Sequence, residues 1–130
     1  MSARILYIED NPQNFYLVNY ILKARGHDVI WAKDGPEGLK AAAGGRPDLV
    51  LLDIQLPGMD GYAVARAFRA DPALGRTPII ALTSYAMAGD RQKALQAGCD
   101  AYIEKPLNPK TFAAQVEEHL PGGPGPKAGL

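Results

Sequence analysis

The 130-residue sequence is short of several features that define common protein classes. Its single cysteine, Cys99, excludes an internal disulfide framework and a cysteine-rich zinc site. The 14 Lys and Arg residues balance 14 Asp and Glu, so the basic excess typical of nucleic-acid binders is missing. No apolar run approaches the roughly 20 residues of a membrane helix, and the first residues do not resemble a signal peptide. We therefore expect a soluble, cytoplasmic protein that contacts neither nucleic acid nor membrane directly.

Five short apolar runs, each of strand length and rich in Ile, Val or Leu, alternate with segments of helical spacing. Strands that alternate with helices form right-handed βαβ units, so the pattern predicts a parallel sheet covered on both faces. The chain is also long enough to bury a core without a disulfide or a metal ion. The predicted strands are Ile5–Ile8, Val29–Trp31, Leu49–Leu52, Ile79–Leu82 and Ala101–Ile103.

Capping residues, prolines and glycines mark the ends of the predicted helices. Asn11 can cap a helix that begins at Pro12, and Gly26 fits just past its end. Apolar residues recur at three- and four-residue steps between these two positions. Further helices are predicted from Gly35 to Gly45, from Tyr62 to Ala70, up to Gly98, and from Asn108 to Leu120.

The composition of the strands indicates their order in the sheet. The first, third and fourth runs are continuously apolar, whereas the second is short and is flanked by Asp28 and Lys33, which places it at an edge. We predict an α/β, flavodoxin-like (βα)5 three-layer sandwich with a parallel five-stranded sheet in the order 2-1-3-4-5. One domain is expected over residues 1–120, followed by a flexible Pro/Gly-rich tail over 121–130.

Polar residues follow four of the five predicted strands. In an open parallel sheet the functional crevice lies beyond the carboxyl ends of the strands, so these residues are expected to converge there. From these strand ends, three acids (Glu9, Asp10 and Asp53), the Thr83 hydroxyl and the Lys105 ammonium would project toward one end of the sheet. The residues that follow the strands are Glu9 and Asp10, then Asp53, then Thr83 and Ser84, and finally Glu104, Lys105 and Pro106.

The three acids predict a magnesium site. Carboxylates about 5 Å apart repel by roughly 3 kcal/mol per pair at an effective dielectric near 20, so a cation is expected to offset them. A few oxygen ligands with no His or Cys nearby suit Mg²⁺ better than a full Ca²⁺ cage. The alternative is that these acids are solvated loop or capping residues. That alternative fits Asp10, beside Asn11, better than Asp53, which directly follows a very apolar strand.

Thr83 and Lys105 extend the predicted site toward phosphate chemistry. A hydroxyl and an ammonium aimed at one point can receive the oxygens of a phosphoryl group held against a metal. Taken singly, each has a simpler explanation, as a strand-end residue and a solvated lysine. The Lys105–Pro106 bond is a candidate cis peptide. His27 and His119 have no partner by spacing, so neither is assigned a metal or catalytic role.

Four motifs together resemble the receiver domain of two-component response regulators, over residues 4–120. In order and at receiver-like spacing, they are Ile8-Glu9-Asp10-Asn11, the run from Leu52 through Asp53 to Gly61, Ala81-Leu82-Thr83-Ser84, and Tyr102-Ile103-Glu104-Lys105-Pro106. The segment from Ala81 to Pro106 is especially similar to single-domain regulators of the cell-division type, although receivers of hybrid kinases share it.

The resemblance implies a role for each matched residue. Asp53 would accept the phosphoryl group. Mg²⁺ would bind to Asp10, Asp53 and the backbone carbonyl of Gln55, with Glu9 acting largely through water. Thr83 and Lys105 would hold phosphoryl oxygens, and Thr83 and Tyr102 would form the conformational switch. Gln55 and Tyr85 would tune the lifetime of the acyl phosphate.

The resemblance also implies partners and excludes ordinary enzymatic turnover. A sensor histidine kinase or a histidine phosphotransfer protein would donate the phosphoryl group, and an unidentified downstream protein would read it. The protein itself would be a phosphoacceptor signalling domain, present as a monomer or a weak homodimer.

Two other functions are compatible with the same fold. A Mg²⁺-dependent phosphatase could use a strand-end Asp nucleophile, but only Gln55 occupies the position two residues after Asp53, where a general acid would be needed. A receiver that binds partners without phosphorylation is the other possibility. The complete set of acids, hydroxyl and lysine weighs against it.

Overall fold

The computed structural model describes residues 2–56, 58, 60–84 and 89–120. Pro57, Tyr85 and the predicted tail over 121–130 lie outside these residues. The strands are β1 (Arg4–Ile8), β2 (Asp28–Ala32), β3 (Leu49–Asp53), β4 (Ile79–Thr83) and β5 (Ala101–Glu104). The helices are α1 (Pro12–Lys23), α2 (Gly35–Gly45), α3 (Gly61–Ala70), α4 (Asp90–Ala97) and α5 (Phe112–Glu117).

The described strands form one parallel sheet in the order β2-β1-β3-β4-β5, which confirms the predicted order and fold class. The register brings the carboxyl ends of neighbouring strands level: Asp53 pairs with Leu82, and Thr83 pairs with Glu104. Each of these ends is extended by a backbone hydrogen bond, from Ile54 N–H to the Leu82 carbonyl and from Lys105 N–H to the Thr83 carbonyl. The residues that follow these strands are therefore held together at the carboxyl ends of the strands.

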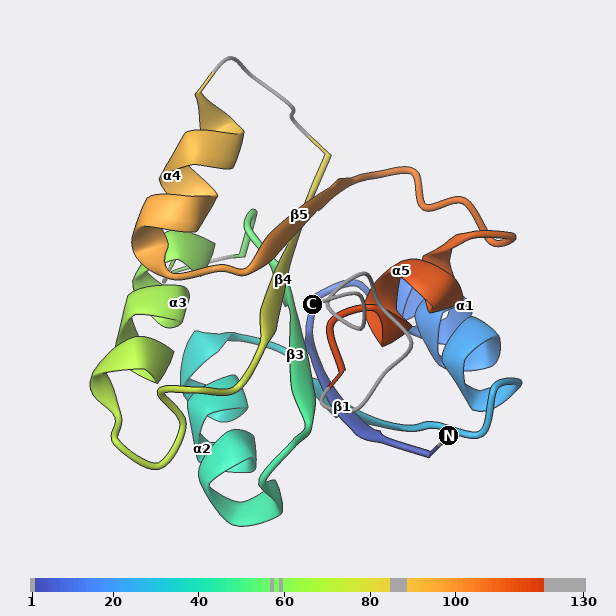
Figure 1. Ribbon diagram of the computed structural model, residues 1–130, viewed down its shortest axis with the longest axis horizontal. Helices are drawn as coiled ribbons and strands as arrows, with labels where there is room; N and C mark the ends of the chain where they lie inside the picture. Colours follow the sequence, from blue (N-terminus) through green and yellow to red (C-terminus); the bar gives the residue numbers. More distant parts are fainter. Residues whose placement is uncertain (1, 57, 59, 85–88, 121–130) are drawn as a thin grey trace, which may run out of the picture.

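Helices cover both faces of the sheet (Figure 1). The helices α2, α3 and α4 lie on one side and α1 and α5 on the other. Successive side chains of a strand point to opposite faces of the sheet. Leu6 and Ile8 of β1 pack in the core under α2, α3 and α4, whereas Ile5 and Tyr7 pack in the core under α1 and α5. All residues of the central strands β3 and β4 are buried, whereas the middle of β2 is half-buried, as expected at an edge.

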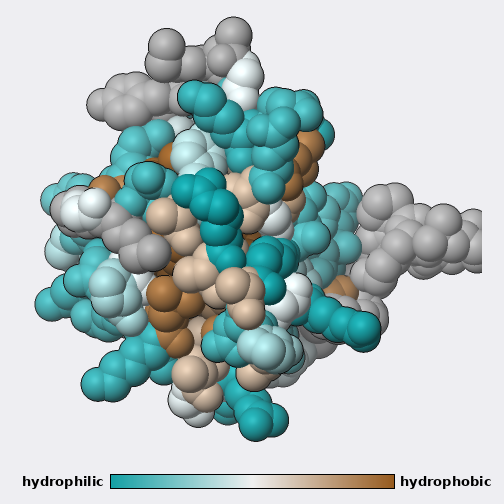
Figure 2. All heavy atoms as spheres, turned by 90° about the vertical axis from the view of Figure 1, so that its left-hand side faces the viewer, coloured by the Kyte–Doolittle hydropathy of each residue, from teal (hydrophilic) through white to brown (hydrophobic). Residues whose placement is uncertain are grey.

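The side of the molecule formed by α2, α3 and α4 is mainly hydrophilic at its surface. Figure 2 shows hydrophilic side chains covering much of this face, with smaller apolar areas between them. Leu95 on α4 is among the exposed large apolar residues, at 43%. Within the described residues, no helix is long and apolar enough to cross a membrane.

The predicted start of the first helix and end of the fourth are confirmed. The Asn11 side chain accepts hydrogen bonds from the N–H groups of Gln13 and Asn14, and Pro12 occupies the first turn. Gly98 ends α4 with a φ of 108°, in the left-handed region that only glycine adopts easily.

The fifth helix is shorter than predicted. It spans Phe112–Glu117 rather than 108–120. Asn108 organises a tight turn instead: its side chain accepts from Lys110 N–H at 2.9 Å, and its carbonyl accepts from Thr111 N–H, three residues on, at 3.1 Å. The far end tightens in the same way, because Leu120 N–H donates to the Glu117 carbonyl three residues back. Competition from such local hydrogen bonds shortens the α-helical part at both ends.

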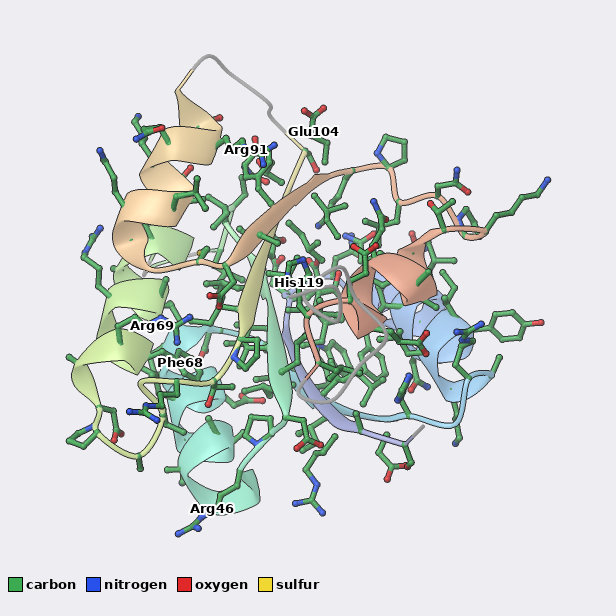
Figure 3. The ribbon with its side chains drawn as sticks, viewed as in Figure 1. Arg46, Phe68, Arg69, Arg91, Glu104 and His119 are labelled. Atoms are coloured by element: carbon green, nitrogen blue, oxygen red, sulfur yellow. The ribbon has the colours of Figure 1, made fainter. Side chains whose placement is uncertain are left out.

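Arg69 of α3 hydrogen-bonds with two loops at the amino-terminal ends of the strands (Figure 3). Its guanidinium donates to the carbonyls of Gly98 at 2.8 Å and Thr77 at 2.7 Å, and to the Asp100 carboxylate at 2.8 Å. The adjacent Phe68 is fully buried in the core. The turn that leads into β4 and the turn that leads into β5 are therefore fixed to the same side chain.

Candidate functional site

The three acids predicted to converge do so at the carboxyl edge of the sheet. Glu9 and Asp10 follow β1, and Asp53 is the last residue of the neighbouring strand β3. Glu9 is 1% exposed and Asp53 is 4% exposed, whereas Asp10 is open to solvent. One carboxylate oxygen from each of the three lies within 4.8 Å of the others. The cluster therefore combines two buried carboxylates, Glu9 and Asp53, with one that is exposed to solvent, Asp10.

Hydrogen bonds satisfy Glu9 in its buried position. Its Oε1 accepts from the Tyr7 hydroxyl at 2.9 Å and from Lys105 Nζ at 2.8 Å, and its Oε2 accepts from the backbone N–H of Asn11 at 3.2 Å. Burial alone would raise the pKa of Glu9, but the hydrogen bond and charge of Lys105, together with Tyr7, outweigh it and lower the pKa. Glu9 is therefore a fixed negative charge beside Asp53.

The Asp53 carboxylate is less well compensated. Its Oδ1 accepts from the backbone N–H of Gln55 at 2.9 Å, and its Oδ2 lies 3.4 Å from Lys105 Nζ. Burial, followed by the charge of Glu9, raises its pKa to about 6 despite these contacts. The negative charge of Asp53 is therefore costly in this arrangement, and an added cation would favour it.

Thr83 is placed at the end of β4, where its hydroxyl contacts the Gln55 side chain. The carboxamide of Gln55 donates from Nε2 to Thr83 Oγ1 at 2.5 Å. Tyr102 lies on the neighbouring strand β5, where it pairs with Ala81, two residues before Thr83. The Gln55 carboxamide also accepts from the Ser84 backbone N–H, Oε1 to N at 3.1 Å. The two residues predicted to form a switch therefore lie on neighbouring strands, and Gln55 contacts the first of them.

Lys105 lies at the border between the acidic cluster and an open hollow. The peptide bond between Lys105 and Pro106 is cis. The hollow beside them has a volume of about 430 Å³. Its lining comes from β1, α1, the end of β4 and the segment after β5: Tyr7, Asn14, Leu17, Ser84, Lys105, Pro106 and Leu107.

Trp31 is a site residue that sequence reasoning missed. Its indole N–H donates to the backbone carbonyl of Glu9 at 2.7 Å. Its ring stacks on Phe15 of α1, with the centroids 4.7 Å apart and the planes tilted by 10°. The edge strand β2 thus fixes the backbone of the acidic loop. No spacing pattern signals this contact, because the two residues meet only across neighbouring strands.

The histidines do not take part in the acidic cluster. His27 is buried at the opposite edge of the sheet, where its Nδ1 accepts from Ala3 N–H at 3.0 Å and its Nε2 lies 2.8 Å from Glu117. Glu117 also pairs with Arg25. His27 therefore has a partner after all, 90 residues away, in a contact that ties α5 to the turn before β2. Within the described residues, Glu9, Asp10 and Asp53 form the one group of three or more His, Cys, Asp or Glu side chains close enough to share a metal ion.

Comparison with known proteins agrees with this fold. The response regulator receiver domain family matches residues 5–117. The chain belongs to this family of two-component signalling domains, and the resemblance drawn from its sequence motifs is confirmed.

Among curated proteins, the chain is similar to the polar-differentiation response regulator DivK of Brucella anthropi. The two are 38% identical over 120 residues, which cover 92% of this chain and 98% of the relative. The expected likeness to regulators of the cell-division type is thereby supported.

Two solved structures illustrate the structural similarity. The receiver domain of sensor histidine kinase PA1611 from Pseudomonas aeruginosa, solved with a magnesium ion coordinated in its active site cleft, is 36% identical with a TM-score of 0.83. The match covers 92% of this chain and 98% of that one. The chemotaxis protein CheY4 of Vibrio cholerae has a TM-score of 0.87 at 28% identity, with coverage of 92% and 100%.

Proposed function

We propose that the protein accepts a phosphoryl group on Asp53 from a phosphohistidine of a kinase or phosphotransfer partner. The observation that carries the proposal is the cluster of Glu9, Asp10 and Asp53 within 4.8 Å, with Lys105 Nζ 3.4 Å from Asp53. One lysine cannot neutralise three carboxylates. The site is therefore built to receive further positive charge together with an anionic group.

The donor set fits Mg²⁺. The three carboxylates supply hard oxygen ligands, and Asp10 leaves the cluster open to solvent for the waters that Mg²⁺ retains. Asp10, Asp53 and the Gln55 backbone carbonyl would hold the ion directly, and Glu9 would act largely through water. When bound, Mg²⁺ supplies charge neutralisation for the incoming phosphoryl oxygens. The magnesium-bound PA1611 receiver supports this assignment.

The residues of this chain then divide the transfer between them. An oxygen of Asp53 forms a bond to phosphorus as the bond from phosphorus to the imidazole nitrogen breaks, and that nitrogen retains the electron pair. Lys105 and the Thr83 hydroxyl hold phosphoryl oxygens. Asp53 must be ionised to attack, and its carboxylate already lies beside the Lys105 ammonium.

The output of the transfer is a change at Thr83 and Tyr102. A phosphoryl group adds close to two negative charges and three acceptor oxygens, which draw the Thr83 hydroxyl toward Asp53. Tyr102 lies on the neighbouring strand, opposite Ala81 and two residues before Thr83, so its packing would change when Thr83 moves. The surface of α4, β5 and α5 would carry the signal to a downstream protein.

The phosphatase alternative is disfavoured by Gln55. A carboxamide cannot donate a proton as a general acid, and both ends of this one are hydrogen-bonded, to Thr83 and to the Ser84 N–H. A receiver that acts without phosphorylation is disfavoured by the complete acidic cluster, which is destabilising unless it binds a cation.

Beryllofluoride, which mimics a phosphoryl group on a carboxylate, tests the proposal. With Mg²⁺ present it should raise the melting temperature, and acetyl phosphate should add one phosphoryl group detectable by mass spectrometry. Asp53→Asn should abolish both responses. Asp28→Asn, an exposed acid at the start of β2, is the matched control and should retain them. An unchanged response in Asp53→Asn would overturn the assignment.

A further inference from the structure

The Gln55 carboxamide bridges the loop after β3 and the end of β4. Its Oε1 accepts from the Ser84 backbone N–H at 3.1 Å, and its Nε2 donates to Thr83 Oγ1 at 2.5 Å. A backbone N–H can only donate, so the amide oxygen must face Ser84 and the amide nitrogen must face Thr83. The Thr83 hydroxyl therefore accepts from Gln55, and its own proton is directed elsewhere.

Thr83 stands between Gln55 and Tyr102. Tyr102 lies on the neighbouring strand β5, where it pairs in register with Ala81, two residues before Thr83. The three side chains form a row from the loop that carries the phosphoacceptor to the strand that carries the switch residue. Loss of the Gln55 hydrogen bond would therefore change the position of the Thr83 hydroxyl, and with it the packing of Tyr102.

The groups that Gln55 occupies are the donors that an added phosphoryl group needs. Three phosphoryl oxygens require hydrogen-bond donors, and at the end of β4 these are the Thr83 hydroxyl and the Ser84 N–H. Gln55 takes the Ser84 N–H with its own oxygen, and its Nε2 group holds the Thr83 oxygen through one lone pair. The backbone N–H of Gln55 also donates to Asp53 Oδ1 at 2.9 Å. This bond holds the backbone that carries the Gln55 carboxamide close to the carboxylate that would be phosphorylated.

We propose that the Gln55 carboxamide is a placeholder that fills the phosphoryl-oxygen site of the resting protein. It must leave Ser84 and release Thr83 when Asp53 is phosphorylated, so it stabilises the resting conformation against the phosphorylated one. Gln55 thus acts as an autoinhibitory positioning residue. This inference rests on the proposed phosphoacceptor function of Asp53.

The expected size of the effect follows from the hydrogen bonds and their exposure. The Gln55 residue is exposed, so water competes for both contacts. Removing hydrogen bonds of ordinary net strength from the resting state should tighten binding of a phosphoryl mimic by roughly threefold to tenfold. The affinity for Mg²⁺ alone should change little, because the backbone carbonyl of residue 55 is present in every variant.

Gln55→Met tests the placeholder, because it keeps the length of the side chain and removes both hydrogen-bonding groups. Gln55→Asn is the second variant: it keeps the amide but shortens the side chain by one methylene. Gln115→Met, an exposed glutamine on α5, is the matched control. The affinity for beryllofluoride at saturating Mg²⁺ is measured for all four proteins by thermal shift, and the Ser84 amide resonance is followed by NMR.

Each outcome decides a separate point. The proposal requires tighter beryllofluoride binding in Gln55→Met and Gln55→Asn, a shifted Ser84 amide before the mimic is added, and unchanged binding in Gln115→Met. Equal or weaker binding in both Gln55 variants, while the wild type responds normally, overturns the placeholder and leaves the phosphoacceptor function intact. A wild type that binds no beryllofluoride at all overturns both.

Discussion

The Lys105 ammonium makes its shorter contact with Glu9, at 2.8 Å from Nζ to Oε1, although it also reaches the adjacent Asp53 at 3.4 Å. The Lys105 charge therefore compensates the Glu9 carboxylate more strongly than the Asp53 carboxylate. Asp53 remains buried beside Glu9 with only partial compensation, which is why its pKa is raised. The two contacts together leave Asp53 with a negative charge that an added cation would stabilise.

Lys105→Met should destabilise the metal-free protein by about 3 kcal/mol at neutral pH, because it leaves the buried Glu9 carboxylate without its cation. The free energy of unfolding in urea with a chelator present measures this. Lys110→Met removes an exposed lysine and should change stability by less than about 0.5 kcal/mol. A Lys105→Met protein as stable as the control would contradict the pairing.

Asp53→Asn should stabilise the metal-free protein at pH 7, by about 2 kcal/mol. The folded-state pKa of Asp53 is raised from 3.8 to about 6, so the folded protein binds this proton more strongly than the unfolded chain does. Its contribution to stability therefore falls as the pH rises from about 4 to about 6. Urea unfolding of both proteins across that range should show the gap open with rising pH and close in saturating Mg²⁺. A gap independent of pH would refute the charge explanation.

Trp31→Phe should weaken Mg²⁺ binding by roughly threefold to tenfold, because it retains an aromatic ring to stack on Phe15 but loses the N–H bond to the Glu9 carbonyl. The Mg²⁺ dependence of the melting temperature gives the affinity. Phe15→Leu, which disturbs the stack and keeps the indole N–H, should alter stability more than Mg²⁺ affinity. Equal Mg²⁺ affinities in wild type and Trp31→Phe would exclude a positioning role for the indole.

Glu117→Gln should cost about 2 kcal/mol at pH 7, since the carboxylate is buried and accepts charge-assisted hydrogen bonds. The hydrogen bond from Arg25 lowers the pKa of Glu117 below its ordinary 4.5, aided by His27 and opposed by burial. A lowered carboxyl pKa gives stability that is present above 4.5 and is lost as the pH falls through the folded-state pKa. Acid unfolding curves should therefore converge for wild type and variant, and Glu118→Gln at the exposed neighbouring position should follow the wild type.

Gly61→Ala should destabilise the protein by about 2 kcal/mol and displace the loop after Asp53. A Cβ at Gly61 would lie 2.6 Å from Ile54 Cα and 2.8 Å from the Asp53 carbonyl oxygen, and backbone cannot yield as a side chain can. Gly44→Ala is the opposite case, because its Cβ would meet nothing within 4 Å, and it should stabilise α2 by about 0.5–1 kcal/mol. Thermal unfolding of the two variants should move in opposite directions.

The sequence by itself determined the sheet, its strand order and the convergence of Glu9, Asp10 and Asp53. Apolar periodicity records which segments are buried on both faces, and parallel strands align their carboxyl ends without any need to know side-chain conformations. The acids at the carboxyl ends of β1 and β3 therefore belong to one site on the strength of the sequence alone.

Only the tertiary structure decided which side chains meet across elements. The Gln55 contact with Thr83 spans 28 residues, Trp31 reaches Glu9 across 22, and His27 meets Glu117 across 90. Such contacts depend on strand register, side-chain rotamers and local turns, none of which leaves a periodic trace along the chain. The short α5 has the same cause, because the turn at Asn108 competes with helical hydrogen bonds that propensity alone would extend.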